Sequence, residues 1–199
     1  MRIGVLGSGQ VGGSMARKLQ SLGHDVMVGS RSAPERTAEF PGIKLGTAPE
    51  AAAHGEWVVN ALPGETSLQV LGRCEIDGKI LVDIGNYDIA VDQPIPTPLG
   101  EAIQKAHPGA RVVKTLNSVS AHLMVEPGNL QQRHSVFIAS NDDAAKRAVT
   151  ELLRSFGWQD IIDLGDLSNC RAMEQLIPLW MSLERKFGGP QFNLAVVRG

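Results

Sequence analysis

The stretch Ile3-Gly4-Val5-Leu6-Gly7-Ser8-Gly9-Gln10-Val11-Gly12 decides the fold of this chain. It begins with a short apolar run that predicts a buried strand, and it is followed by Ser14–Leu19, which predicts a helix. A G-x-G-x-x-G turn between a strand and a helix is typical of a dinucleotide-binding fingerprint. We therefore expect a strand, a tight glycine turn and a helix that together hold a dinucleotide.

Each glycine of this turn has a different predicted role. Gly7 permits the tight turn, Gly9 lets the backbone approach a pyrophosphate because it has no Cβ, and Gly12 lets the helix pack against the strand. The free N–H groups at the helix start should bind the phosphates, since the helix dipole favours negative charge there. The predicted pyrophosphate-binding residues are Gly7, Ser8, Gly9, Gln10, Val11 and Gly12.

The end of the second predicted strand, Val26–Val28, indicates which dinucleotide binds. An NAD site usually has Asp or Glu there, which bonds the ribose 2′-OH. This chain instead has the sequence Gly-Ser-Arg-Ser at 29–32, whose guanidinium and hydroxyl groups suit a 2′-phosphate. We therefore predict NADP(H) as the cofactor. The predicted 2′-phosphate ligands are Ser30, Arg31, Ser32 and, one turn further on, Arg36.

The composition is that of one compact domain, or of one domain with an extension. The chain has 199 residues and a formal net charge of −2, which gives no footprint for nucleic acid and no basic block for a membrane surface. Its two cysteines, Cys74 and Cys170, are far apart, so neither a disulfide framework nor a metal site is predicted. No apolar run reaches the roughly 18 residues needed to span a membrane. We therefore expect a cytoplasmic protein without a metal, a nucleic-acid partner or a membrane partner.

Strand-like and helical segments alternate along most of the chain, which predicts an α/β fold with a doubly wound, mostly parallel sheet of the Rossmann type. The predicted strands are 3–6, 26–28, 43–45, 57–60, 79–83, 111–114, 135–138 and 160–163. The predicted helices between them are 14–19, 49–54, 65–73, 99–106 and 142–156, and a loop rich in proline and glycine covers 85–97. We expect residues 1–165 to form the NADP-binding domain, and residues 166–199 to form a short C-terminal helical extension that closes the substrate cleft.

The extension has apolar residues at helical spacing, namely Met173, Leu176, Ile177, Trp180, Leu183 and Phe187. Pro178 should kink this helix, and Gly188-Gly189 should end it. Its wide apolar face could cover the sheet alone or also pair with a second subunit, and we favour a homodimer. Because the extension is too short to form a separate substrate domain, the second substrate should bind at the carboxyl edge of the sheet.

Three predicted loops at this edge should reach the nicotinamide: Asn60–Gly64, Ile84–Asp88 and Lys114–Ser120. Small residues in the first loop let the backbone pass close to the cofactor. Asn86 and Asn117 each end a strand and could bond the carboxamide or the second substrate, although asparagine in a turn often bonds only its own backbone. The predicted cofactor-binding residues of these loops are Asn60, Ala61, Leu62, Pro63, Asn86 and Asn117.

No nucleophile–base arrangement stands out in the sequence. The five histidines are scattered, and none pairs with Cys or Asp at the spacing of a metal site or a catalytic triad. Asn117, Lys114 and His122 are candidates for a catalytic role, and Tyr87 is a further candidate proton donor, although a lysine at a strand end is more often solvated. Hydride transfer between two cofactors needs mainly alignment, so the lack of an obvious acid–base pair fits such a reaction.

Four segments, Gly7–Gly12, Val28–Arg31, Val112–Ala121 and Arg171–Glu174, carry a family resemblance that covers nearly the whole chain. They resemble the NADPH-dependent coenzyme F-420 reductases (F-420:NADP oxidoreductases) and the cytosolic reductase domain of the six-transmembrane epithelial antigen of prostate metalloreductases. The resemblance implies a homodimer in which hydride passes directly between the nicotinamide and a deazaflavin. It assigns the 2′-phosphate to Ser30, Arg31 and Arg36, the pyrophosphate to Ser8 and the glycines, and the nicotinamide ribose to Leu62 and Pro63.

The resemblance leaves the electron acceptor open, because the segment Asn117–Val119 is nearer to the flavin-linked version than to the deazaflavin version. We expect an NADPH-dependent oxidoreductase that transfers hydride to or from coenzyme F-420 or a flavin such as FMN or FAD. One alternative is an NADPH-dependent reductase of a small carbonyl, imine or quinone, which would need a proton donor. Another is a module that senses NADPH without turnover.

Overall fold

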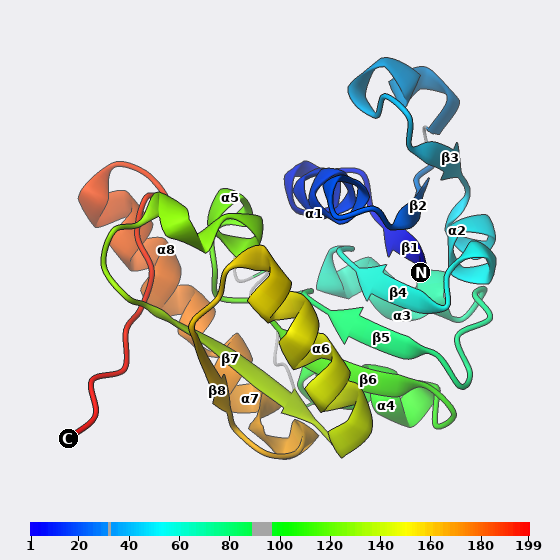
Figure 1. Cartoon of the computed structure of the whole chain (residues 1–199). Coiled ribbons are helices and arrows are strands. Elements are labelled where there is room, and N and C mark those ends of the chain that lie inside the picture. Colours follow the sequence, from blue (N-terminus) through cyan, green and yellow to red (C-terminus); the bar gives the residue numbers. More distant parts are fainter. Residues whose placement is uncertain (32, 89–96) are drawn as a thin grey trace.

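An eight-stranded sheet forms the centre of the computed structural model, which describes residues 1–31, 33–88 and 97–199 (Figure 1). Its strand order is β3-β2-β1-β4-β5-β6-β7-β8. The strands are β1 (Arg2–Leu6), β2 (Asp25–Gly29), β3 (Lys44–Gly46), β4 (Trp57–Asn60), β5 (Ile80–Asp83), β6 (Arg111–Thr115), β7 (Ser135–Ser140) and β8 (Asp160–Asp163). The order changes direction between β1 and β4, which is the switch point where doubly wound sheets bind ligands. The predicted Rossmann-type α/β fold is confirmed.

Helices cover both faces of the sheet, and a separate apolar cluster fills the space beneath each layer. One face carries α1 (Gln10–Ser21), α5 (Ala121–Val125) and α6 (Asp143–Phe156). The other carries α2 (Ala48–His54), α3 (Gly64–Leu71), α4 (Leu99–Ala106) and α7 (Cys170–Glu174). The short 3₁₀ helices are η1 (Ala33–Glu39), η2 (Pro127–Asn129) and η3 (Leu167–Asn169). Within the described residues, no helix combines the length and the apolar character that crossing a membrane requires.

The sheet is parallel except where β6 meets β7, with Thr115 opposite Ile138. The connection between these two strands carries α5 and η2. Because the chain leaves β6 and re-enters the sheet at the same edge, β7 runs in the opposite direction. This connection therefore lies at the carboxyl edge of the central strands. The described part of the chain leaves out Ser32 and residues 89–96. Most of the predicted loop rich in proline and glycine, 85–97, falls in the second of these gaps.

The C-terminal extension differs from the expected single kinked helix. Helix α7 ends at Glu174, and α8 (Leu176–Phe187) begins after Gln175. The break has a physical reason, because the ring of Pro178 would clash with the carbonyl group of Glu174 in a continuous helix, whereas the first turn of a new helix tolerates proline. Gly188, with a φ of 73°, ends α8 as predicted.

An ion pair fixes the start of β6. Arg111 donates to Asp142, the N-cap of α6, from Nε over 2.6 Å and from Nη2 over 3.2 Å. The bond from Arg111, together with the backbone N–H of Ala145, lowers the pKa of Asp142 from 3.8 to about 2. Because this pKa is lower in the folded state, the stabilisation is present above pH 3.8 and is lost as the pH falls towards 2.

We expect Asp142→Asn to remove this acid-sensitive contribution. The difference in free energy of unfolding between the wild type and the variant should be clear at neutral pH and should narrow towards pH 2. Urea unfolding at both pH values measures it. A difference of equal size at both pH values would contradict the assignment of the pKa shift to this contact.

Candidate functional site

Gly7 and Gly12 are required by the packing of the chain itself. The φ of Gly7 is 106°, and a Cβ there would lie 2.6 Å from the carbonyl oxygen of Ala61. A Cβ on Gly12 would lie 2.0 Å from the carbonyl oxygen of Gly7. The glycine turn is thus pressed against the end of β4 on one side and against the start of α1 on the other.

Gly9 is different, because a Cβ on it would meet no protein atom within 4 Å. Its φ of −70° is open to any residue, so neither packing nor backbone conformation explains a glycine there. The space that such a Cβ would occupy is where the pyrophosphate of a dinucleotide lies in this fold. Helix α1 has no side-chain cap and no acidic residue in its first turn, so its first N–H groups are available to phosphate oxygens. The turn therefore fits a pyrophosphate.

A guanidinium and two hydroxyl groups meet beside this turn. Ser8 Oγ donates to Ser30 Oγ over 2.8 Å, and Arg36 Nη1 donates to Ser8 Oγ over 2.7 Å. The remaining edge of the Arg36 guanidinium is held by Glu39, with Nε and Nη2 at 2.8 and 2.6 Å from its carboxylate oxygens. Such a group of donors suits a phosphate dianion. The structure brings Arg36 to the serine pair, whereas Arg31 is exposed after β2; the predicted ligand Ser32 is not among the described residues.

Asn60 is turned into the protein and not towards a ligand. Its side chain is fully buried, and Nδ2 donates to Asp83 Oδ1 over 2.9 Å and to Ser67 Oγ over 3.2 Å. The reason is that β4 pairs with β5, which places Asn60 opposite Asp83. The predicted contact between the Asn60 side chain and the cofactor is therefore not supported. Asn60 shapes the loop, and Ala61, Leu62 and Pro63 are its remaining candidates for cofactor contact.

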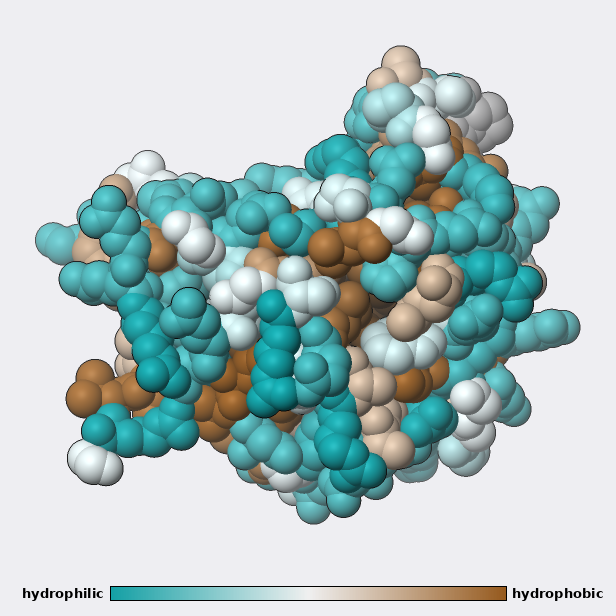
Figure 2. Space-filling model, viewed as in Figure 1, coloured by the Kyte–Doolittle hydropathy of each residue, from teal (hydrophilic) through white to brown (hydrophobic). Residues whose placement is uncertain are grey.

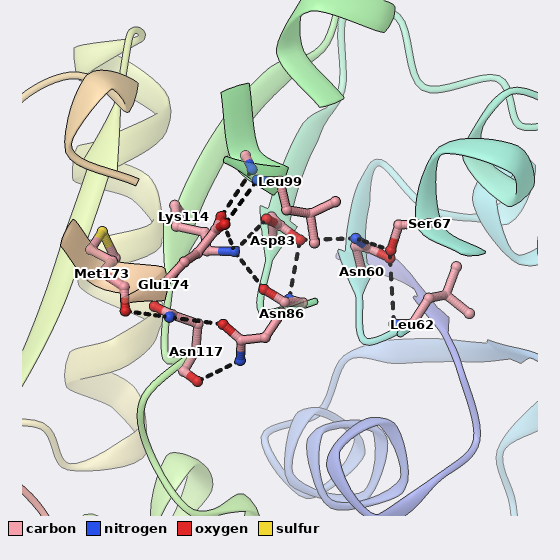
Figure 3. A network of polar contacts seen from close by, with 12 residues as sticks. Asn60, Leu62, Ser67, Asp83, Asn86, Leu99, Lys114, Asn117, Met173 and Glu174 are labelled. Atoms are coloured by element: carbon pink, nitrogen blue, oxygen red, sulfur yellow. Dashed lines mark hydrogen bonds and ion pairs between the residues drawn. The ribbon is translucent and has the colours of Figure 1, made fainter. Parts of the chain in front are cut away.

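The three predicted loops meet at the carboxyl edge of the sheet (Figure 3). Asn86 Nδ2 donates to the carbonyl oxygen of Asn117 over 2.7 Å, and Asn117 Nδ2 donates back to Asn86 Oδ1 over 3.1 Å. Asn117 Nδ2 also donates to the carbonyl oxygen of Met173 in α7 over 2.9 Å. The backbone N–H of Gly64 donates to the carbonyl oxygen of Asn86 over 2.9 Å. Asn86 and Asn117 thus join the loops after β4, β5 and β6 to the C-terminal extension.

The backbone just before Asn117 is strained. Leu116 has a φ of 61°, a conformation that costs a residue with a Cβ about 1–2 kcal/mol. Its side chain is buried in the apolar cluster under α1, α5 and α6, which holds the backbone in this conformation. Such strain is often found at functional sites, because the surrounding structure holds the next side chain in a fixed direction.

Lys114 is fully buried and is not the solvated strand-end lysine that the sequence led us to expect. Its Nζ donates to Asp83 Oδ2 over 2.9 Å and to the carbonyl oxygen of Gly85 over 2.5 Å, and it lies 3.0 Å from Glu174 Oε1 (Figure 3). Although burial opposes its charge, attraction to Asp83 and Glu174 raises the pKa of Lys114. A buried ammonium with three partners is a structural ion and not a ready proton donor.

Asp83 and Glu174 were not identified as site residues from the sequence. Two features of the sequence could have pointed to them. Asp83 ends β5 next to the predicted loops, and Glu174 is the last residue of Arg171–Glu174, one of the segments that carry the family resemblance. Glu174 also accepts hydrogen bonds from the backbone N–H groups of Leu99 and Gly100 at the start of α4, over 2.9 and 3.2 Å.

The other two candidate proton donors, His122 and Tyr87, lie outside the buried ion cluster of Lys114, and their catalytic roles stay predictions. His122 lies on α5, and its Nε2 is 2.6 Å from Gln191 Oε1 in the C-terminal tail. Burial, with the nearby charges of Glu174 and Glu65, raises the pKa of Tyr87, so this phenol stays protonated at neutral pH. In the described part of the chain, no three His, Cys, Asp or Glu side chains are grouped so that they could hold a metal ion.

The glycine turn leaves room for phosphate oxygens and lies, with Arg36 and two serine hydroxyl groups, at the switch point of a doubly wound sheet. This arrangement is typical of dinucleotide-binding domains of the Rossmann class. Residues 2–87 match the family described as "NADP oxidoreductase coenzyme F420-dependent". Metalloreductase STEAP3 of Rattus norvegicus is 33% identical over 90% of this chain and 38% of its own length. The F420-dependent NADP reductase of Methanothermobacter marburgensis is 27% identical over 94% of this chain and 93% of its own length.

A solved structure extends the match to the whole chain. A protein from Arthrobacter sp. FB24, described as a candidate F420-dependent NADP reductase, is 42% identical, with a TM-score of 0.93 and complete coverage of both chains. The chain therefore belongs to the coenzyme F420-dependent NADP oxidoreductase family, whose members are NADP-dependent oxidoreductases. It spans only 35–38% of the length of the metalloreductases that it matches.

Proposed function

We propose that this protein transfers a hydride between NADP(H) and coenzyme F420. The observation that carries the proposal is the end-to-end match, at 42% identity, to a chain described as a candidate F420-dependent NADP reductase. The open cradle at Gly9 and the donors of Ser8, Ser30 and Arg36 support the NADP half of the proposal. NADPH, when bound, supplies the hydride.

The residues of this chain bind and orient, and they need not move a proton. The glycine turn, with Ser8, holds the pyrophosphate, and Ser30, Arg31 and Arg36 hold the 2′-phosphate. Ala61, Leu62 and Pro63 line the nicotinamide ribose. Asn86 and Asn117 orient the carboxamide. Residues 166–199, through α7, close the cleft over these loops. Such alignment suffices for direct hydride transfer, in which the reacting atoms must lie about 3–3.5 Å apart.

Mixing the protein with NADPH and coenzyme F420, and following the absorbance of the reduced nicotinamide, tests the proposal. We expect F420-dependent oxidation of NADPH, and the reverse reaction with reduced F420 and NADP⁺. FMN and FAD are the comparison acceptors, because the segment Asn117–Val119 is nearer to the flavin-linked version of the family. The chain is also 33% identical to a metalloreductase and 27% identical to the archaeal F420-dependent reductase. Turnover with a flavin alone, or only with a small carbonyl or imine, would refute F420 as the substrate.

We expect Arg36→Ala to weaken NADPH binding selectively. Loss of one charge-assisted hydrogen bond costs about 1.5–3 kcal/mol, which is about 10- to 150-fold in affinity. NADH lacks the 2′-phosphate, so its affinity should stay the same. Calorimetry with both cofactors measures the effect. Lys44→Ala, which removes an exposed cation of β3 that pairs with Asp25, controls for the change in net charge. Equal weakening of NADPH and NADH would contradict the predicted role of Arg36.

We also propose that the protein is a homodimer that pairs through α8 and the tail that follows it. No residue of α8 is buried, and Leu179 and Phe187 are 49% and 63% exposed. Figure 2 shows apolar surface over the C-terminal tail, where Val197 is 94% exposed. Light scattering of the wild type should give a molar mass twice that of the chain. The double variant Leu179→Asp with Phe187→Asp should give the mass of a single chain. A monomeric wild type would refute the proposal.

We propose a cytoplasmic location for this activity. Both cysteines of the chain, Cys74 and Cys170, are unpaired, which is compatible with a reducing compartment. Cell fractionation with an antibody to the protein tests the location, and recovery in an extracytoplasmic fraction would refute it.

A further inference from the structure

The buried ion triad of Asp83, Lys114 and Glu174 lies beside Asn86 and Asn117, in the loops that should hold the nicotinamide (Figure 3). The three protons of Lys114 Nζ are directed to three different segments: the end of β5 at Asp83, the following loop at Gly85, and α7 at Glu174. The triad therefore connects the sheet, a cofactor loop and the C-terminal extension at one buried point.

A buried ion triad is a costly way to hold a fold together. Apolar side chains of similar volume often give equal or greater stability, because each buried charge loses its hydration. Two carboxylates and one ammonium leave a net negative charge, and the N–H groups of Leu99 and Gly100 at the start of α4 offset it at Glu174. The carboxylate of Glu174 is therefore held from three sides, by Lys114 and by the N–H groups of Leu99 and Gly100.

The two hydrogen-bonded asparagines sit between the ends of this connection. Lys114 holds the carbonyl group of Gly85, the residue just before Asn86. The carbonyl oxygen of Met173, the residue just before Glu174, accepts from Asn117 Nδ2, and Asn117 Nδ2 also donates to Asn86 Oδ1. Each asparagine is therefore attached to the triad through a neighbouring residue, one from the sheet side and one from α7.

We propose that Glu174 is a positioning residue that, through Lys114 and the Met173 carbonyl group, fixes Asn86 and Asn117 for the nicotinamide half of the cofactor. The inference rests on the proposed function only in that NADP(H) is the ligand of this edge. Without Glu174, Lys114 and Asp83 still form a neutral pair, but α7 loses its bond to Lys114 and the N–H groups of α4 lose their acceptor. The asparagine pair should then lose its fixed orientation, while the glycine turn and the Ser8–Ser30–Arg36 cluster should stay intact.

Calorimetric titration with two ligands separates the two halves of the site. NADPH carries the nicotinamide half, whereas 2′,5′-ADP carries only the adenosine half with its phosphates. We expect Glu174→Ala to lower the affinity of the protein for NADPH by about tenfold, which is the value of one hydrogen bond to a charged group. The affinity of the same variant for 2′,5′-ADP should not change. Glu174→Gln keeps an oxygen that accepts from Lys114 and Gly100, but its amide nitrogen faces the N–H group of Leu99, so it should recover only part of the NADPH affinity.

Arg111→Met is the control for a general loss of stability. It breaks the ion pair at the opposite end of the same strand, β6, and should lower the unfolding midpoint without changing the affinity for either ligand. If Glu174→Ala does not fold, Glu174→Asp, which withdraws the carboxylate by one methylene, serves in its place.

Three results would overturn the inference. The Glu174 variant could bind both ligands equally more weakly, or it could bind NADPH as tightly as the wild type does. The third is a selective loss of NADPH affinity in Arg111→Met. A wild-type protein that binds neither ligand would instead refute the proposed function, and the inference with it.

Discussion

Gly9→Ala is expected to abolish NADPH binding at concentrations that saturate the wild type, while the protein stays as stable as before. The new Cβ would meet no protein atom within 4 Å, but it would enter the space that the pyrophosphate needs. Steric overlap and lost hydrogen bonds to the phosphates together should cost on the order of 100-fold or more in affinity. Calorimetry with NADPH measures this loss.

The free energy of unfolding should hardly change in Gly9→Ala. Gly9 is the N-cap of α1, where alanine is the poorer cap by about 0.5–1 kcal/mol. Replacing glycine by alanine also restricts the unfolded chain, which stabilises the fold by about 0.4–1 kcal/mol. The two effects offset each other. Gly12→Ala is the matched control, because its Cβ would lie 2.0 Å from the Gly7 carbonyl oxygen and should lower stability directly. Normal NADPH binding by Gly9→Ala would show that the phosphates do not lie at this turn.

Lys114→Met is expected to have the largest effect on stability. It leaves the carboxylates of Asp83 and Glu174 buried without their ammonium partner, and such a change costs about 3–5 kcal/mol. The pKa of Lys114 is raised by the two carboxylates, so in the wild type the stabilisation is present throughout the neutral range and is lost only as the pH rises above the usual lysine value. Urea unfolding at neutral pH measures the difference.

A variant without any of the three charges is the control for this prediction. Lys114→Met combined with Asp83→Asn and Glu174→Gln removes the unpaired carboxylates, so it should recover a large part of the lost stability. A loss below about 1 kcal/mol in Lys114→Met alone would mean that the two carboxylates find other partners or take up protons without strain.

The glycine turn and the sheet could be predicted from the sequence because their signals are local. The strand, turn and helix of residues 2–21 follow directly from one another, and β4, β8 and α4 begin and end where the sequence indicated. The sequence also predicted that the loops after β4, β5 and β6 meet, since parallel neighbouring strands place their carboxyl ends at one edge of the sheet.

The rest depends on partners that are distant in the sequence. Lys114 is buried because Asp83 and Glu174, 31 and 60 residues away in the sequence, come to it, and no local pattern announces such a triad. Arg36, and not Arg31, reaches Ser8 because η1 folds back towards the glycine turn. The break before α8 required knowledge of which helix position Pro178 would take.

The central claim is that the opening turn holds NADP(H) and that a guanidinium nearby selects its 2′-phosphate. Calorimetric titration of the wild-type protein with NADPH and with NADH tests this most directly. The predicted result is saturable binding of NADPH at least about tenfold tighter than that of NADH, as expected for one charge-assisted hydrogen bond to the extra phosphate. Absence of NADPH binding, or tighter binding of NADH, would contradict the claim.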